Sequence, residues 1–454
     1  MLMLTTEWTA VFIILAALIA GYLFVRLPIV RKSFIPGSLA AGVLLLVLGP
    51  QVAGQYFAEW QIPDIYYRYW SPLPAVLINV VFACLFLARA LLPIKKIWQL
   101  AAPQAAFGQM IAWGQYALGG LVTLFLLIPI FGANKLSAAL IEISFEGGHG
   151  TAAGLEDVFK QLSFEEGQGL AVGLATLSLI AALISGMILV HWGQRKKHIK
   201  IAQHRSLSQM VYHRRIIYEL RKKGITLREH ITPSRLISHL ALVGLAILFG
   251  WLIHQSLLFI EALTWAKSGI VIFKYLPMFT LCMFGGMLAR VVWNHLGFSI
   301  SRSIIELIGA ASLSVLIATA IGTMSLEYIS THLGIFLTLA ATGIIWILSA
   351  FILFAPRMFK RNWFQNGIVN MAQSMGQTAT GILFVKMVDP KDKTEAMESF
   401  GYKQLLFEPF VGGGIITALS MPAIILLGLP TFTIVASIVC ITWLLIGLFY
   451  FSKL

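Results

Sequence analysis

Charged residues are scarce in this chain: Asp, Glu, Lys and Arg make up only 11% of its 454 residues. Soluble domains carry roughly 25% charged residues. Hydrophobic residues reach 58%, more than a soluble core of this length can hide. These proportions exclude a soluble enzyme, a nucleic-acid-binding protein and a disordered tail. The apolar runs are continuous rather than alternating, which also excludes an outer-membrane barrel.

Cysteine is equally rare. Cys84, Cys282 and Cys440 each lie in an apolar run, where a thiol behaves as a small hydrophobic side chain. They form neither a CxxC metal motif nor a disulfide framework. The chain also has no nucleotide-binding loop, HExxH, nucleophile elbow or haem motif. We therefore expect a membrane protein that is not an enzyme and has no organic cofactor.

Long apolar runs dominate the chain, and about 20 apolar residues suffice to span a bilayer as a helix. We predict eleven transmembrane helices, near residues 8–25, 35–50, 72–92, 104–131, 168–191, 236–260, 271–289, 303–323, 332–355, 402–428 and 430–452. The first run lacks a basic n-region and a cleavage site, so we interpret it as a helix rather than a signal peptide.

Two further segments, 136–160 and 363–388, are less apolar and rich in Gly, Ser, Thr and Gln. They are too polar to face lipid and too apolar for ordinary loops. Irregular backbone is tolerated at membrane depth where it is buried in protein or lines a wet cavity. We therefore predict that both segments are re-entrant hairpins.

The net charge of +14 is concentrated in one place, because residues 195–235 supply +10 of it. Placing this loop in the cytoplasm puts 28 Lys and Arg residues inside and 5 outside, as the positive-inside rule requires. The N-terminus is then outside and the C-terminus cytoplasmic. The run that includes Lys200 either binds anionic lipid or only anchors the topology.

The two halves of the chain resemble each other in order and spacing. The segments that begin at Pro36, Pro74 and Gly147 match those at Pro277, Glu306 and Ser374, at offsets that differ little from one pair to the next. Each half has five spans and one hairpin, and five is odd, so the second half enters the membrane from the opposite side. Inverted repeats of this kind are typical of secondary transporters.

This repeat defines the expected domain organisation of an all-α polytopic membrane protein. The expected segments are a first repeat at 1–194, a basic cytoplasmic loop at 195–235, a second repeat at 236–428 and an extra C-terminal helix at 429–454.

The hairpins carry most of the candidate site residues. In the first they are Glu146, Gly147, Gly148, His149, Gly150 and Thr151, and in the second Gln373, Ser374, Gly376, Gln377, Thr378 and Thr380. Glycines expose backbone groups to a ligand, and hydroxyl and carbonyl oxygens suit Na⁺, for which we single out Thr151, Ser374 and Thr378. The structural alternatives are a tightly packed glycine turn and a polar helix inside the bundle.

Polar residues inside the spans are weaker candidates. Ser312 and Ser314 lie on the third span of the second half, where such residues more often bridge helices. Glu408 precedes Pro409 and a run of three glycines. It is either an intramembrane functional carboxylate or a solvated residue at the cytoplasmic end of its span.

These motifs resemble those of the bacterial sodium/glutamate symporter (ESS) family, over residues 8–428. The run Gly147–Thr151 matches the family's SGGHGT motif. Ser374, Gly376, Ala379 and Thr380 follow its second hairpin pattern, with Gly381 in place of a proline. Two shorter family segments are matched at Ser312–Val315 and Pro409–Gly412.

The resemblance implies Na⁺-coupled symport of glutamate, or a related acidic amino acid or dicarboxylate, across the inner membrane by an elevator-like or rocking carrier. The protein is then surrounded by membrane lipid, and a homodimer is one assembly left open. The concentration of the positive charge in one loop argues against a nucleic-acid partner. A channel-like protein or a non-transporting sensor on the same scaffold is the alternative.

Five positions depart from the family pattern. Glu146 replaces a serine, polar Gln377 and Thr378 replace apolar or glycine positions, Ala310 replaces an asparagine and Thr417 an aspartate. An ionised Glu146 would add a cation ligand, whereas a protonated one would let a proton join or replace a sodium ion.

Overall fold

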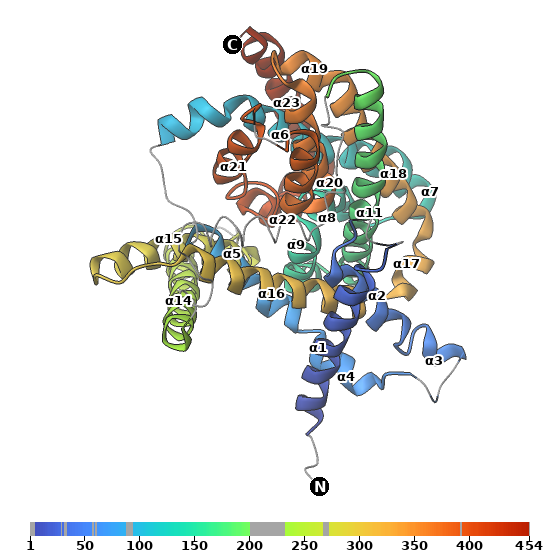
Figure 1. Cartoon of the computed structure of the whole chain (residues 1–454). Helices are drawn as coiled ribbons and strands as arrows, with labels where there is room; N and C mark the ends of the chain where they lie inside the picture. The colour runs from blue at the N-terminus through green and yellow to red at the C-terminus, as the bar shows by residue number, and fades with distance from the viewer. Residues whose placement is uncertain are drawn as a thin grey trace.

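The computed structural model describes residues 5–28, 30, 34–56, 59, 61–87, 94–199, 232–266, 272–390 and 393–453 of the chain. Within these ranges the secondary structure is helical, without a strand (Figure 1). The expectation of an all-α chain is therefore confirmed. Most of the predicted basic loop 195–235, including Lys200, lies outside the described residues.

Eight helices in the described ranges are long and apolar enough to cross a membrane, and each coincides with a predicted run. They are α1 (Thr6–Phe24), α4 with α5 (Asp64–Trp70 and Leu73–Leu87), α6 with α7 (Ile94–Val122 and Ile128–Phe131), α11 (Glu165–Arg195), α14 (Pro233–Leu263), α16 (Arg302–Gly322), α18 with α19 (Leu333–Ser349 and Ala355–Met358) and α23 (Leu429–Phe449).

Two other predicted runs form shorter helices. The run 35–50 contains α2 (Gly37–Val47), whose 11 residues are too few to cross a bilayer alone. The run 271–289 becomes α15 (Met278–His295), which starts later and ends later than the apolar residues indicate.

The prediction of one continuous helix over 402–428 is wrong. That run is divided between α21 (Ala396–Phe407) and α22 (Ile415–Leu427). Between the two helices lie Pro409, which has no backbone N–H to donate, and three successive glycines. Gly412 and Gly413 have φ of +72° and +102°, a conformation that glycine adopts without steric cost.

Short helices connect the long ones or belong to the two polar segments. They are α3 (Ala53–Tyr56), η4 (Lys135–Ala139), α8 (Leu140–Phe145), α9 (Gly148–Gly154), α10 (Glu156–Gln161), η6 (Phe273–Tyr275), α17 (Leu326–Thr331) and η8 (Phe451–Lys453). The second polar segment is α20 (Trp363–Val388).

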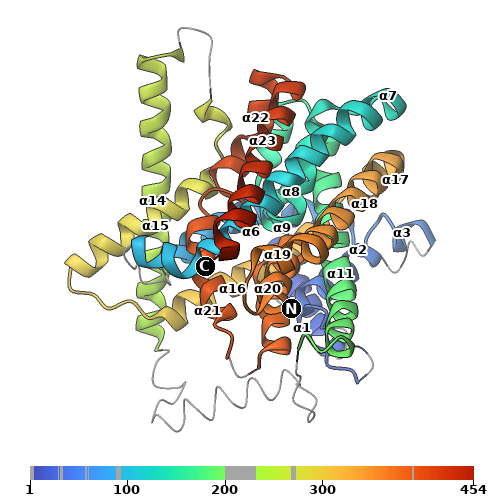
Figure 2. The same cartoon turned by 90° about the horizontal axis from the view of Figure 1, so that it is seen from above.

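The helices form two packed groups. Figure 1 shows α14, α15 and α16 in the lower part of the molecule and α6, α21 and α23 in the upper part, and Figure 2 shows α14 and α15 at one side. In the first group α14 packs on α15, α15 on α5, α5 on α16, α16 on α2 and α2 on α1. In the second group α6 packs on α21 and α23, and α11 packs on α8, α9 and α20. The groups meet where α9 packs against α5 and α16, so the first polar segment lies at their boundary.

A π-helical turn interrupts the end of α6 and of α18. The turns span Thr123–Leu127 and Ala350–Phe354. Each is followed by a short helix with a proline at its second position, Pro129 in one and Pro356 in the other. π-helical turns are rare and often mark functional sites. The number of residues from Thr123 to Ala350 equals that from Pro129 to Pro356. It also equals the number from Gly147 to Ser374, the matched positions of the two polar segments.

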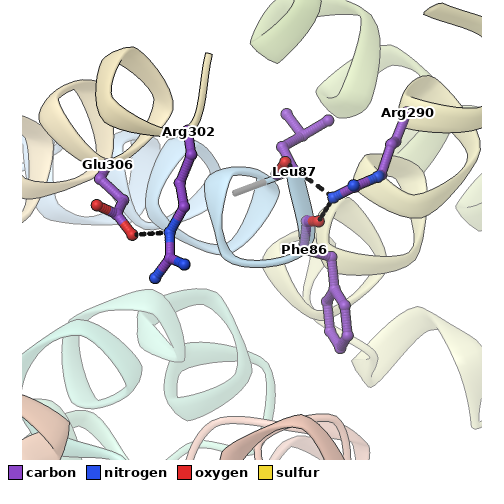
Figure 3. A network of polar contacts seen from close by, with 5 residues as sticks. All are labelled: Phe86, Leu87, Arg290, Arg302 and Glu306. Atoms are coloured by element: carbon purple, nitrogen blue, oxygen red, sulfur yellow. Dashed lines mark hydrogen bonds and ion pairs between the residues drawn. The ribbon is translucent and has the colours of Figure 1, made fainter. Parts of the chain in front are cut away.

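The guanidinium group of Arg290, on α15, caps the C-terminal end of α5 (Figure 3). Its Nη1 donates to the carbonyl oxygens of Phe86 and Leu87 at 3.5 and 3.3 Å. These carbonyls belong to the last turn of α5, where helical partners run out and a cation is favourable. Nearby, Arg302 and Glu306 form an exposed ion pair along α16 at 2.6 Å.

Candidate functional site

Three interruptions of helix geometry lie in the second packed group (Figures 1 and 2). The first separates α8 from α9, the second divides α20, and the third separates α21 from α22. Residues of α20 contact both α8 and α9. An interrupted helix leaves backbone N–H and C=O groups without their helical partners. These three breaks therefore place polar backbone inside an otherwise apolar bundle.

The break in α20 reverses the direction of the chain. Gly376 has φ −142° and Gln377 has φ +72° with ψ 166°. A Cβ atom on Gly381 would lie 2.7 Å from the carbonyl oxygen of Val369, so the second half of α20 runs back along the first. Positive φ costs free energy in a residue other than glycine, and such strain is often found at functional sites.

The first break contacts the second through side chains that the sequence analysis singled out. Gly148 has φ +71°, and a Cβ atom there would lie 2.9 Å from Gln377 Nε2. The same amide nitrogen lies 3.4 Å from His149 Nδ1. The other nitrogen of this ring, Nε2, is 3.0 Å from the hydroxyl of Thr176 on α11. The structure thus brings the two predicted hairpin segments together.

The Glu146 carboxylate lies between both polar segments and α6, and the residue is 4% exposed. Gln373 Nε2 donates a hydrogen bond to its Oε1 at 2.6 Å, and Gln115 Nε2 donates to its Oε2 at 3.3 Å. An ionised carboxylate in an apolar bundle requires such partners, because desolvation is costly. Glu146 and Gln373, predicted separately, are therefore direct partners.

A second carboxylate, Glu142, lies one helical turn before Glu146 and is fully buried. The Tyr116 hydroxyl donates to Glu142 Oε2 at 2.5 Å. The Thr417 hydroxyl and the Gly412 backbone N–H donate to Oε1 at 2.8 and 3.0 Å. Glu142 thereby ties α6 and α8 to the third break.

The third break also contacts the first polar segment through Gly412 and Gly413. A Cβ atom on Gly413 would lie 2.5 Å from Thr151 Oγ1, and one on Gly412 would lie 3.4 Å from the Glu146 carbonyl oxygen. The Thr151 hydroxyl donates to the Gly147 carbonyl oxygen at 3.0 Å. All three breaks thus meet within side-chain contact of one another.

A third polar cluster joins the second half of α20 to the end of α21. Thr378 Oγ1 donates to Glu408 Oε1 at 3.1 Å. Gln404 Nε2 donates to Thr378 Oγ1 at 2.7 Å and to Glu408 Oε1 at 2.8 Å. Glu408 is half-buried, so the structure places it beside a candidate Na⁺ ligand rather than in open solvent.

Two buried amide oxygens beside these carboxylates accept no hydrogen bond from a described residue, Gln115 Oε1 and Gln404 Oε1. The Ser374 hydroxyl interacts with the Glu146 carboxylate. Buried polar atoms are rarely left without a partner, and each exception needs an explanation. These oxygens and the carboxylates form a set of hard donors of the kind that binds a desolvated alkali cation.

The other predicted residues are placed differently. The Thr380 hydroxyl donates to the Gly376 carbonyl oxygen, within the break. A Cβ atom on Gly150 would meet Ile78 of α5 at 2.6 Å, so this glycine lies at a helix contact.

The two candidate serines of α16 lie outside the junction of the breaks. The Ser314 hydroxyl donates to the Ala310 carbonyl oxygen at 2.9 Å and lies 3.2 Å from the Tyr22 hydroxyl. Ser312 is half-buried on the same helix.

Sequence reasoning missed several members of the site. They are Glu142, Gln115, Tyr116, Lys403 and Gln404. Glu142 had a usable signal, since a second acid four residues before Glu146 lies on the same helical face. Lys403 has the appearance of a lysine at the cytoplasmic end of a span, yet it is fully buried. Gln115 and Tyr116 lie in an apolar run that gives no such sign.

The long apolar helices, which enclose a buried polar junction, indicate a multi-pass membrane protein. A family model described as sodium/glutamate symporter matches residues 2–388. The chain therefore belongs to the sodium/glutamate symporter family, whose activity is secondary transport of glutamate coupled to Na⁺. Searches of curated proteins and of solved structures gave no match. The match ends at α20, so Lys403, Glu408 and Thr417 enter the site from beyond it.

Gly148→Ala is expected to abolish uptake without preventing insertion. The new Cβ atom would meet the Gln377 amide, and positive φ would add about 1–3 kcal/mol of strain. The measurement is Na⁺-driven glutamate uptake in proteoliposomes at matched protein content. Gly401→Ala, on α21, is the control because a Cβ atom there meets nothing within 4 Å. Uptake by the Gly148 variant at the control's rate would contradict the site.

Proposed function

We propose that glutamate and its coupling Na⁺ bind together where the three helix breaks meet, around Glu142 and Glu146. The observation that carries this proposal is the convergence of three interrupted elements on two buried carboxylates. Ionisable residues in an apolar bundle are costly and usually mark a substrate or ion pathway. Discontinuous helices supply the backbone dipoles and carbonyls that transporters use for ions and anionic groups.

In this proposal the Na⁺ ligands are oxygens that face Glu146. Gln115 Oε1 is buried and accepts no hydrogen bond from a described residue, and the Ser374 hydroxyl interacts with the Glu146 carboxylate. Gln115 already contacts the carboxylate through its nitrogen, so a cation beside its oxygen would remain close to the negative charge. Thr151 and Thr378 are the further candidates, at the first and second breaks. Na⁺ is cargo as well as driving ion.

We further propose that the chain consists of two inverted repeats, 1–194 and 236–428, followed by an extra helix at 429–454. Each repeat would hold one re-entrant hairpin and five membrane elements, the last of which in the second repeat is the broken pair α21 and α22. The π-helical turns at equivalent places in the two halves support a repeat. So does the reversal of the chain within α20. The packing of α9 at the boundary of two helix groups suits alternating access, in which one group moves against the other.

The proposed orientation places the N-terminus outside the inner membrane, and the basic segment 195–235 and the C-terminus in the cytoplasm. It rests on the distribution of Lys and Arg along the chain. Residues Arg195 to Lys197, at the start of the basic segment, are exposed at the end of α11. In this position they can contact anionic lipid.

Glu146→Ser and Glu146→Gln are expected to change how uptake depends on Na⁺. Removing a buried carboxylate that faces the cation costs a charge-assisted contact of about 1.5–3 kcal/mol, so half-saturating Na⁺ should rise at least about tenfold. The measurement is uptake against Na⁺ concentration, scanned over glutamate, aspartate and neutral amino acids. Glu306→Gln, an exposed acid on α16, is the control. Identical ion dependence and substrate order in all variants would place Glu146 outside the site.

The orientation is tested by single cysteines at Thr5 and Lys197, two exposed positions. A membrane-impermeant thiol reagent should label the Thr5 variant in intact cells and the Lys197 variant only after the cytoplasmic face is opened. The three native cysteines are buried, so background labelling should be low. Labelling of both variants from one side would mean that an odd number of spans has been miscounted.

A further inference from the structure

Lys403 of α21 is a fully buried lysine, 0% exposed. Its Nζ lies 3.6 Å from the centroid of the Phe407 ring and 5.6 Å from that of Phe400. Its stem packs against α6, since a Cβ atom on Gly108 would lie 2.6 Å from Lys403 Cε. Lysine is almost never fully buried without a compensating partner, so the charge of this side chain must be balanced locally.

The hydrogen-bond partner of Lys403 is Gln373, in the first half of α20. Lys403 Nζ donates to Gln373 Oε1 at 2.7 Å, and Gln373 Nε2 donates to Glu146 Oε1 at 2.6 Å. The amide thus stands between an ammonium and a carboxylate, with its oxygen toward the positive charge and its nitrogen toward the negative one. Both hydrogen bonds are charge-assisted, the stronger kind.

The bridge couples two charges that belong to different parts of the chain. Glu146 and Glu408 are the anions whose electrostatic field acts on Lys403. Attraction across the length of one amide remains substantial because burial removes the screening that water provides. Lys403 therefore offsets the carboxylate that would otherwise repel an acidic substrate from the junction.

We propose that Lys403 is a tethered monovalent cation that takes the place of one dissociable Na⁺ ion at the site, by neutralising Glu146 through Gln373. This inference rests on the proposed function of the junction. An acidic substrate brings negative charge into a site that already holds buried carboxylates. Cations must balance the charge of the substrate and that of the carboxylates. Each positive charge that the protein supplies reduces by one the number of Na⁺ ions that must bind from solution.

The test compares the wild type with Lys403→Met, Glu146→Gln and the double variant in proteoliposomes. The readout is the steepness of glutamate uptake against Na⁺ concentration, together with the Na⁺-to-glutamate ratio at thermodynamic balance. Lys403→Met should raise both by about one ion, because the uncompensated charge of Glu146 then recruits a further Na⁺ from solution. Glu146→Gln should lower both, and the double variant should return to the wild-type values. Lys393→Met, an exposed lysine, is the matched control.

The neutral double variant keeps the test decisive if Lys403→Met fails to fold, because removing both partners avoids an uncompensated buried charge. Equal Na⁺ steepness in Glu146→Gln and in the double variant would then overturn the proposal. So would Lys403→Met with unchanged steepness and a glutamate KM raised about a hundredfold, which would assign Lys403 to the substrate instead. Absence of Na⁺-dependent glutamate uptake by the wild type would contradict the proposed function itself.

Discussion

The structure depends on one constraint: two carboxylates, Glu142 and Glu146, are buried one helical turn apart inside an apolar bundle. Neither is compatible with this position unless other elements bring donors to it. Glu142 takes its donors from α6 and from the third break. Glu146 takes its donors from α6 and from α20. The requirement for donors explains why elements from opposite halves of the sequence meet at one point.

The fold class and the helix breaks within the two polar segments could be predicted from the sequence because both are local properties. Continuous apolar runs identify the long helices, and glycine-rich polar segments identify where regular helix stops. The partition of 402–428 was missed, since its hydropathy is continuous and the break is caused by Pro409 and the glycines after it. Glu408 was noticed, yet its pairing with Thr378 and Gln404 depends on tertiary contact.

Partners that come from different segments could not be derived from spacing. Gln115 and Tyr116 look like ordinary polar interruptions of a span, and only the packing of α6 beside α8 turns them toward the carboxylates. Lys403 resembles a lysine that reaches the membrane surface, whereas the fold buries it against Gly108 and Phe407. The family match ends at residue 388, so the match alone would not identify these C-terminal contributions.

Na⁺ and glutamate, we propose, bind together at the junction held by Glu142. The most direct measurement is the thermal unfolding of purified protein with glutamate alone, with Na⁺ alone and with both. Glutamate at about 100 times its Kd should stabilise the protein by about 2.7 kcal/mol in Na⁺, and far less in K⁺. Glu142→Gln should abolish this increment while the variant still unfolds cooperatively. Equal stabilisation by glutamate in Na⁺ and K⁺, or an unchanged increment in Glu142→Gln, would contradict a shared site at the three breaks.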